Sequence, residues 1–293
     1  MYPYLNLGFA HVGTFGLLLW LAAVCATVVL HKNFVRNNVE ADALNVVAVV
    51  VLAGIVGAKL WHELEDPHQL AVAWHQIFAS GNAALNFLHW FQAGFAWYGG
   101  LLASIFTLMW QGRVIRFKSP LEGTLGPRIG ALRMLDLAAP AAALGYGVGR
   151  IGCLTSGDGD YGINTTLPWG VHMAHGSDIY HRALVPPIPA DALVQPTPIY
   201  ELLFALVVFW LIWKLGEKHK PIGWMTGLYL ALSGVGRFLV EFVRINPKLY
   251  LGNHFSNAQM AALGSILAGV VLLLAAAKVN RQWPPTISND VRT

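Results

Sequence analysis

The stretch WMTGLYLALSGVGRFLVEFV, residues 224–243, decides the fold class of this chain. It is almost wholly apolar, and a helix needs about 20 such residues to cross the hydrocarbon core of a bilayer. Comparable apolar runs recur along the chain and are centred on residues 14–30, 44–60, 95–111, 134–151, 198–214 and 258–277. The sequence therefore predicts an all-α integral membrane protein with seven transmembrane helices.

Composition favours a membrane protein over a soluble one. Of the 293 residues, 56% are hydrophobic and only 12% are charged, whereas about 25% of the residues in soluble domains are charged. The first apolar run is interpreted as a helix and not as a cleaved signal, because residues 1–13 contain no Lys or Arg. Cys25 lies in that run and Cys153 follows the fourth, so we expect no disulfide between them.

The positions of Lys and Arg predict the orientation, because positively charged loops stay on the cytoplasmic side. Residues 61–93 contain no Lys or Arg, and residues 153–197 contain only Arg182. The alternate connections and the C-terminal tail carry basic residues, among them Lys32, Arg36, Arg113, Arg116, Lys118, Arg128, Arg133, Lys214, Lys218, Lys220, Lys278, Arg281 and Arg292. We therefore expect the N-terminus outside and the C-terminus in the cytoplasm. The formal net charge of +4 reflects this bias and indicates no nucleic-acid partner.

The chain is expected to form a single transmembrane domain, residues 1–293, with two outer excursions. Residues 61–93 are rich in His and aromatic side chains and are predicted to form an amphipathic segment at the membrane interface. Residues 153–197 are predicted to form an outer loop or cap after the fourth helix, because the prolines at 186–189 interrupt any helix there.

Small residues fall within or beside several spans, where they let helices approach closely. They include Gly54, Gly57, Gly99, Gly100, Gly145, Gly147 and Gly149. Helix packing by itself would explain most of them.

Two groups of polar residues in the outer excursion are candidates for metal sites. Asp158 and Asp160 lie among glycines, but an EF-hand needs Gly and Glu where this chain has Ile163 and Trp169. A second group recurs every three residues and is typical of a solvated loop more often than of a transition-metal site. Its members are His172, His175, Asp178 and His181. We expect no metal and no cofactor.

Arginines inside the spans indicate a functional site, because a charge at the centre of a span costs about 2.5–3.5 kcal/mol on insertion scales. Arg150 follows Met134 by sixteen residues and Arg237 follows Trp224 by thirteen. At 1.5 Å per residue they lie roughly 24 Å and roughly 20 Å along helices that both run outward. We therefore expect the two arginines at the same level, near the outer surface.

One face of the 224–243 helix carries a polar stripe, because its members are spaced by four, four, four and three residues. They are Tyr229, Ser233, Arg237, Glu241 and Arg244. One interpretation is a structural ion pair of Arg237 with Glu241. The other is an anion site, because Glu241 neutralises only one of the two arginines and guanidinium groups bind phosphate bidentately.

Six segments of the chain occur together in one order. The longest is DLAAPAAALGYGVGRIGCLTSGDGDYG, residues 136–162, in which an Asp-x-x-x-Pro helix ends in Gly-Arg-x-Gly and continues to a Gly followed by an acid. The others are GAKLWHELE, WYGGLLA, PTPIYE, GRFLVEFVR and SNAQ. Together, over roughly residues 8–280, they resemble the phosphatidylglycerol:prolipoprotein diacylglyceryl transferases of bacterial inner membranes.

The resemblance implies an enzyme that transfers the diacylglyceryl group of phosphatidylglycerol to the lipobox cysteine thiol of a prolipoprotein, forming a thioether and releasing glycerol phosphate. It implies membrane lipids and the prolipoprotein signal peptide as partners, no cofactor, and an active site that faces the outer leaflet. Arg150 and Arg237 would hold the phosphate and stabilise the leaving group. The alternatives are a relative with another lipid donor or acceptor, and a non-catalytic protein that binds anionic lipid. A transporter would show an inverted repeat, and we find none.

The resemblance also assigns acid–base roles. Asp158 matches the acidic residue of the signature, and Asp160 competes for that role because the loop is one residue longer than in many members. Either Asp158 or Glu241 is predicted to accept the thiol proton. Tyr98 stands where many members carry His, and a phenol of pKa about 10 is a poor base toward a thiol of about 8.5, so Tyr98 is expected to donate a hydrogen bond.

The remaining matches are predicted to contact substrate. A glycine pair would let the lipid approach closely, Cys153 stands where the signature has Asn, and Ser233 replaces a Tyr. The predicted substrate-binding residues are Gly99, Gly100, Cys153, Gly157, Asp160, Gly162, Ser233 and Arg244.

Overall fold

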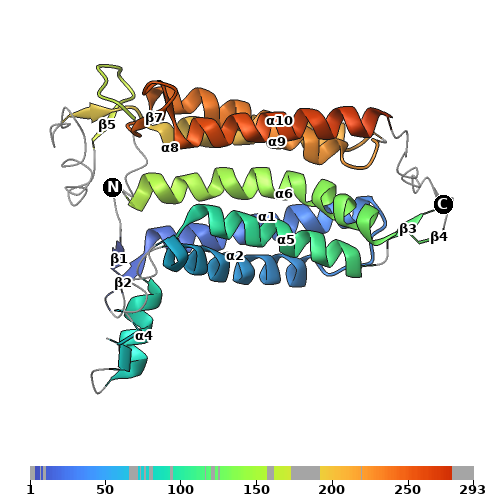
Figure 1. Ribbon diagram of the computed structural model, residues 1–293, viewed down its shortest axis with the longest axis horizontal. Helices are drawn as coiled ribbons and strands as arrows, with labels where there is room; N and C mark the ends of the chain where they lie inside the picture. Colours follow the sequence, from blue (N-terminus) through green and yellow to red (C-terminus); the bar gives the residue numbers. More distant parts are fainter. Residues whose placement is uncertain are drawn as a thin grey trace. The chain divides into compact units, whose positions relative to one another are not determined.

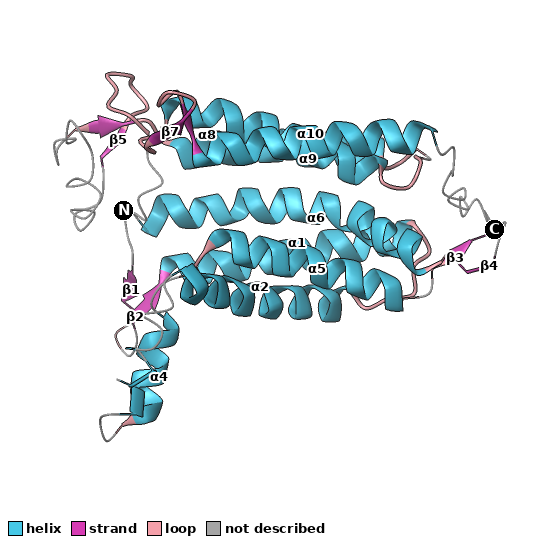
Figure 2. Cartoon of the chain, viewed as in Figure 1, coloured by secondary structure: helices cyan, strands magenta, loops and turns pink. Residues whose placement is uncertain are grey.

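The chain folds into long helices joined by loops and short strand pairs, as the computed structural model shows (Figure 1, Figure 2). It divides into two compact units, Met1–Val39 with Asp136–Thr293, and Glu40–Leu135. The structure describes residues 4–6, 8, 11–65, 72, 74–75, 77–78, 82–92, 95–115, 117–119, 123–124, 126–156, 162–172, 192–218 and 220–278.

The described residues of the first unit form five long helices. They are α1 (Thr14–Arg36), α6 (Pro127–Ser156), α8 (Thr197–Leu215), α9 (Trp224–Val240) and α10 (Asn257–Lys278). The boundary between the two units falls within α6. The 3₁₀-helix η1 (Glu241–Val243) continues α9. Helix α9 packs against both α8 and α10, and α9 and α10 run side by side in Figure 1.

Among its described residues, the first unit also contains three antiparallel strand pairs. Strand β1 (Tyr4–Asn6) pairs with β2 (His11–Gly13), β5 (Val171–His172) with β6 (Leu193–Val194), and β7 (Lys248–Tyr250) with β8 (Phe255–Ser256). Helix α6 exceeds the predicted run 134–151 at both ends and takes in the first residues of the range 153–197 that was predicted to be a loop.

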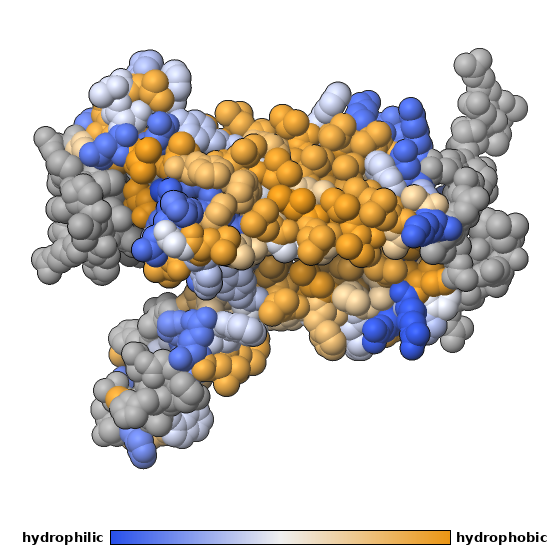
Figure 3. Space-filling model, turned by 45° about the horizontal axis from the view of Figure 1, so that its top comes forward, coloured by the Kyte–Doolittle hydropathy of each residue, from blue (hydrophilic) through white to orange (hydrophobic). Residues whose placement is uncertain are grey.

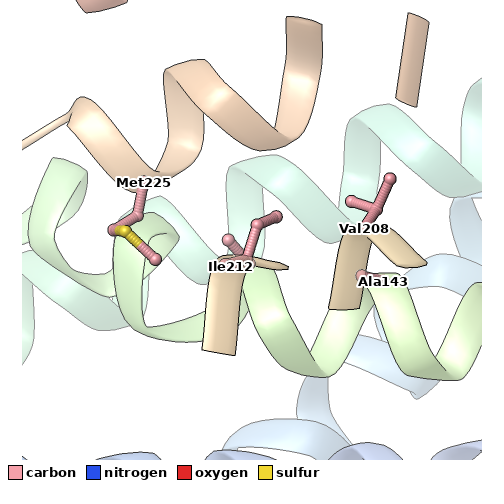
Figure 4. Close-up of a cluster of buried hydrophobic side chains, with 5 residues drawn as sticks. Ala143, Val208, Ile212 and Met225 are labelled. Atoms are coloured by element: carbon pink, nitrogen blue, oxygen red, sulfur yellow. The ribbon is translucent and has the colours of Figure 1, made fainter. Parts of the chain in front are cut away.

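An apolar cluster holds α6, α8 and α9 together. Val208 and Ile212 lie four residues apart on α8, so they share a face of that helix, and Met225 of α9 and Ala143 of α6 complete the contact (Figure 4). Ile212 is completely buried. Because small alanines on α6 face larger side chains on α8, the two helices can pack closely.

The second unit contains α2 (Ala43–Glu65), α4 (Ala83–Gln92), α5 (Trp97–Val114) and the strand pair β3 (Lys118–Ser119) and β4 (Gly123–Thr124). Helices α2 and α5 lie side by side (Figure 1). A Cβ atom on Gly99 would overlap the carbonyl oxygen of Gly57, and one on Gly54 would lie 2.8 Å from the hydroxyl of Ser104. The predicted packing role of these glycines is therefore confirmed.

A buried lysine connects α2 with α4 in the second unit. Lys59 Nζ lies 2.7 Å from Glu63 Oε1, donates a 2.7 Å hydrogen bond to the carbonyl oxygen of Trp90, and lies 4.4 Å from the centroid of the Trp90 ring. These contacts satisfy a charge that is otherwise costly to bury. Helix α4 falls within the predicted interfacial segment 61–93, and that interfacial placement stays a prediction.

Six of the described helical segments are long and apolar enough to span a membrane: α1, α2, α6, α8, the continuous segment Trp224–Val243, and α10. All seven predicted runs are helical, but α5 is not among the six, and Gln111 and Arg113 near its end lower its hydropathy. Hydrophobic side chains cover the middle of the helices and hydrophilic ones gather near their ends (Figure 3). The all-helical membrane fold is thus confirmed, whereas a seventh span and the orientation stay predictions.

Candidate active site

Three arginines meet one carboxylate inside the first unit. Glu201, in the second turn of α8, places Oε2 2.9 Å from Arg150 Nε and Oε1 2.5 Å from Arg237 Nη1. Arg244 Nη1 lies 3.6 Å from the same Oε1 atom. We name these residues, together with Glu241, the arginine–glutamate cluster. The prediction that Arg150 and Arg237 reach the same level is confirmed, because they share one partner.

Glu241 is the second carboxylate of the cluster, and both of its oxygens are engaged. Its Oε2 atom lies 3.2 Å from Arg237 Nη2 and 3.5 Å from Arg244 Nε. Its Oε1 atom accepts hydrogen bonds from Asn246 Nδ2 at 2.6 Å and from Ser256 Oγ at 2.7 Å. Charge-assisted contacts of this kind are stronger than neutral hydrogen bonds, so they fix the carboxylate in place.

The SNAQ segment explains how Ser256 is held. The backbone N–H of Ser256 donates to Gln259 Oε1 at 3.0 Å, and the backbone N–H of Gln259 donates to Ser256 Oγ at 3.2 Å. This reciprocal pair is a capping box at the start of α10. It directs the Ser256 hydroxyl toward Glu241 and places that carboxylate near a helix N-terminus, where negative charge is stabilised.

The cluster buries its carboxylates and leaves two of its guanidinium groups partly open. The side chains of Glu201, Glu241 and Arg244 are 2%, 1% and 5% exposed, whereas those of Arg150 and Arg237 are 13% and 25% exposed. An anion that approaches the cluster would therefore meet Arg150 and Arg237 first.

Arg150 is held on three sides by described residues. Its Nε atom faces Glu201, its Nη1 atom lies 3.6 Å from Cys153 Sγ, and its guanidinium carbon lies 4.7 Å from the centroid of the Tyr146 ring. Cation–π contact with an aromatic face stabilises such a group. Both Tyr146 and Cys153 lie one turn away on α6, so the helix itself sets the orientation of Arg150.

Gly162 lies where three segments cross. Its N–H donates to the carbonyl oxygen of Gln195 at 2.9 Å, and the next residue, Ile163, donates to the carbonyl oxygen of Val243 at 2.8 Å. A Cβ atom at position 162 would overlap the Gln195 side chain and lie 2.5 Å from the Val243 oxygen. Only glycine fits here, and the crossing ties the residues after α6 to the start of α8 and the end of η1.

The structure corrects the charge argument made from the sequence. Glu201 was not among the predicted site residues, yet it supplies the second carboxylate, so both arginines have a protein partner. One feature of the sequence could have pointed to Glu201: it is a single acidic residue near the start of an apolar span, and a charge in a span is costly unless it is paired. Among the described members of the cluster, guanidinium groups still outnumber carboxylates by three to two.

The polar stripe of the 224–243 segment divides into two parts. Tyr229 packs against the apolar cluster of α6, α8 and α9, and the Ser233 hydroxyl donates to the Leu230 carbonyl oxygen at 3.3 Å within its own helix. Only the later members of the stripe join the arginine–glutamate cluster. The helix also tightens to a 3₁₀ turn at Glu241, and Arg244 is extended, with φ −89° and ψ 156°.

Several predicted residues lie outside the described part of the chain. They are Gly157, Asp158 and Asp160, together with His175, Asp178 and His181. Within the described residues, no group of three His, Cys, Asp or Glu side chains is placed to hold a metal ion.

Tyr98, Gly99 and Gly100 belong to the second unit. Tyr98 is 39% exposed, and its ring meets that of Trp97 edge to face with the ring centroids 5.5 Å apart, which lies within the range of about 4.5–7 Å for aromatic pairs. A Cβ atom on Gly100 would lie 3.2 Å from the carbonyl oxygen of Gly54. The Gly99–Gly100 pair of α5 thus allows the backbone of α2 to approach closely. The predicted roles of Tyr98, Gly99 and Gly100 toward substrate stay predictions.

Comparison with known proteins identifies the family of the chain. The model of the family "Prolipoprotein diacylglyceryl transferase" matches residues 3–275. The phosphatidylglycerol–prolipoprotein diacylglyceryl transferase of Clostridium tetani is 28% identical over 260 residues, which cover 87% of this chain and 90% of the relative. That of Nitratidesulfovibrio vulgaris strain Hildenborough is 31% identical over 235 residues, covering 78% and 73%. The chain therefore belongs to the prolipoprotein diacylglyceryl transferase family.

Proposed function

We propose that this protein transfers the diacylglyceryl group of phosphatidylglycerol to the lipobox cysteine thiol of a prolipoprotein. Family membership over nearly the whole chain supports the reaction class. The observation that carries the proposal for the site is the pair of partly open guanidinium groups, Arg150 and Arg237, which are held together by one buried carboxylate. Such a pair suits the phosphodiester of an anionic lipid.

The reaction exchanges one bond at the glyceryl carbon. The cysteine sulfur forms a bond to the carbon that carries the phosphodiester, and the carbon–oxygen bond to the phosphate breaks. The diacylglyceryl group is then a thioether on the peptide, glycerol phosphate leaves with the bonding electron pair, and the thiol proton passes to a base. The thiolate is the nucleophile, because the neutral thiol is a poor one.

Arg150 and Arg237 are proposed to stabilise the charge that develops on the departing phosphate. Cations that are already in place need no reorganisation when the bond breaks, and removing one such group typically lowers kcat by about 10²–10³-fold. Arg244 is proposed to support them through Glu201 and Glu241, since it contacts both carboxylates and is almost fully buried.

The proton acceptor is proposed to be Asp158, with Asp160 as its alternative in the longer loop. Glu241 was the other residue predicted for this role. Its two oxygens each contact two polar groups within the cluster, so we assign it the task of holding Arg237.

The proposed setting is a bacterial inner membrane, with seven spans, the N-terminus outside and the cluster in the outer half of the bilayer. Six apolar helices and bacterial relatives support a multi-pass membrane protein. The side on which the cluster opens follows from the distribution of Lys and Arg.

The experiment that tests this function combines purified protein, phosphatidylglycerol and a lipobox peptide. We expect the mass of a diacylglyceryl group on the peptide cysteine and an equal amount of released glycerol phosphate. A peptide with Ser in place of Cys serves as the control and should stay unmodified. A relative assayed in parallel serves as the positive control. If the relative is active and this protein gives neither product, the transferase proposal is wrong for this lipid and acceptor. Repeating the assay with other phospholipids then distinguishes an enzyme that uses another lipid donor from a protein that only binds lipid.

A further inference from the structure

Glu201 joins arginines from three separate segments of the first unit. Its carboxylate contacts arginines from two other helical segments, Arg150 on α6 and Arg237 on α9, and reaches Arg244 beyond η1. Both oxygens are used, one on each side. The residue therefore sets the separation of the two partly open guanidinium groups.

The contact between Glu201 and Arg150 also determines the orientation of the Arg150 side chain. Glu201 lies against the Nε atom, and Nη1 points instead toward Cys153 at the end of α6. A guanidinium group is planar and rigid, so an ion pair with Glu201 at its Nε side restricts where its terminal nitrogens can lie.

The local fold holds Glu201 firmly. Pro196 precedes α8, and Pro198 lies in the first turn of that helix. Thr197, between the two prolines, is completely buried. Proline in the first helical turn is preorganised for that conformation. Glu201 follows one turn later and is itself 3% exposed. A carboxylate on such a support has little freedom to follow its partners, so the arginines adapt to it.

We propose that Glu201 is a positioning residue, whose buried carboxylate holds Arg150 and Arg237 at a fixed separation and orientation for one phosphate group. This proposal rests on the proposed function. It assigns Glu201 no contact with substrate. Its charge also lowers the positive potential of the cluster, so it moderates how tightly an anion binds before the reaction.

The two effects of Glu201 predict opposite changes in binding and turnover. The substitution Glu201→Gln keeps the shape and removes the charge, so the arginines lose their shared partner and gain positive potential. We expect kcat to fall by about 100-fold, because two stabilising donors are misplaced. The KM for phosphatidylglycerol should decrease, because ground-state attraction to the phosphate increases.

The measurement compares Glu201→Gln, Glu201→Asp and the parent as full-length protein in detergent. Glu201→Asp keeps the charge but withdraws it by about 1.5 Å, one carbon–carbon bond, and tests the position separately. Glu217→Gln is the matched control, because Glu217 lies just beyond the other end of α8 and its side chain is 51% exposed. Thermal unfolding of each variant reports whether the fold is kept.

A folded Glu201→Gln protein with parental kcat would overturn the proposal. A second result would also overturn the proposal: if both variants lose turnover and lipid affinity equally and unfold at a lower temperature, the role of Glu201 is purely structural. If Glu201→Gln does not fold, Glu201→Asp decides: a lower kcat at unchanged KM and unfolding temperature supports positioning, and parental kcat contradicts it.

Binding of glycerol phosphate, measured by calorimetry, keeps this test separate from the proposed function. If the parent transfers no diacylglyceryl group, the proposed reaction fails, and binding still tests Glu201. Several-fold tighter binding of glycerol phosphate by Glu201→Gln than by Glu217→Gln supports a carboxylate that moderates the arginine pair. Equal affinity in the two variants would overturn the proposal.

Discussion

Asp136 of α6 and Thr226 of α9 are joined by two hydrogen bonds to one carboxylate oxygen. Asp136 Oδ1 accepts from the backbone N–H of Thr226 at 2.8 Å and from its hydroxyl at 2.7 Å, while Oδ2 accepts from the N–H of Gly223 at 2.6 Å. Asp136 thus caps the N-terminus of α9 from another helix, where negative charge is favourable. Gly223 has φ +90°, a conformation that suits glycine.

Replacing Asp136 by Asn should lower the stability of the protein. The amide places an N–H group opposite the N–H of Gly223 or Thr226, and an unsatisfied buried donor costs about 1–3 kcal/mol. Thr226→Val removes one hydroxyl and should cost about 1 kcal/mol. Unfolding in detergent, followed by circular dichroism, measures both, with the exposed Glu217→Gln as a control. Parental stability of Asp136→Asn would show that the cap contributes nothing.

Replacing Arg237 or Arg150 by Lys should reduce diacylglyceryl transfer although the positive charge is kept. Lysine has no guanidinium fork, so it cannot face a carboxylate and a phosphate in the same way. We expect kcat to fall by about 10²–10³-fold in each variant, measured as release of glycerol phosphate. Arg113→Lys changes an exposed arginine of α5 and should be neutral. Full activity of the folded Arg150→Lys and Arg237→Lys proteins would refute the role of the guanidinium fork. Full activity of the folded Arg150→Ala and Arg237→Ala proteins would refute the role of the positive charges.

Gly162→Ala should disturb the active site through the backbone. The added Cβ has no space between Gln195 and Val243, so the three crossing segments must separate. Overpacking of this kind typically costs about 1–3 kcal/mol, and the transfer rate should fall together with the unfolding temperature. Gly264→Ala on α10 is the matched control, because nothing lies within 4 Å of a Cβ there. If both variants behave alike, the crossing does not need glycine.

The predicted orientation can be tested by labelling introduced cysteines. Lys248 in β7 and Lys218 beyond α8 are exposed and lie in connections at opposite ends of α9. An impermeant maleimide added to intact spheroplasts should label Lys248→Cys, and it should label Lys218→Cys only after permeabilisation. The parent, with Cys25 and Cys153, gives the background. The reverse pattern would place the N-terminus in the cytoplasm.

Much of the architecture could be predicted from local sequence. The seven apolar runs are all helices in the structure, because run length and composition are enough to indicate a helix in a membrane. The predicted positions of the helix ends were less accurate. Helix α6 is longer than predicted, because the flanking segment from Pro127 onward is also helical. The similar depth of Arg150 and Arg237 followed from the rise per residue.

The partners of those arginines could not be predicted in the same way. The sequence placed Glu241 beside Arg237 because the two are one turn apart on one helix, and this pair exists. Glu201 lies 36 residues from Arg237 and joins it only because α8 and α9 pack side by side. The roles of Asp158, Asp160 and Tyr98 toward substrate stay predictions.

The amino-acid sequence by itself determined the membrane class, the helical segments, the family and the two arginines, because hydropathy, periodicity and motif order are properties of neighbouring residues. Only the tertiary structure decided that Glu201 is the carboxylate they share, that Gly162 lies at a crossing and that Gly99 faces Gly57. These contacts depend on how far each helix is rotated and shifted against the next, and that is set by the packing of side chains from distant parts of the chain.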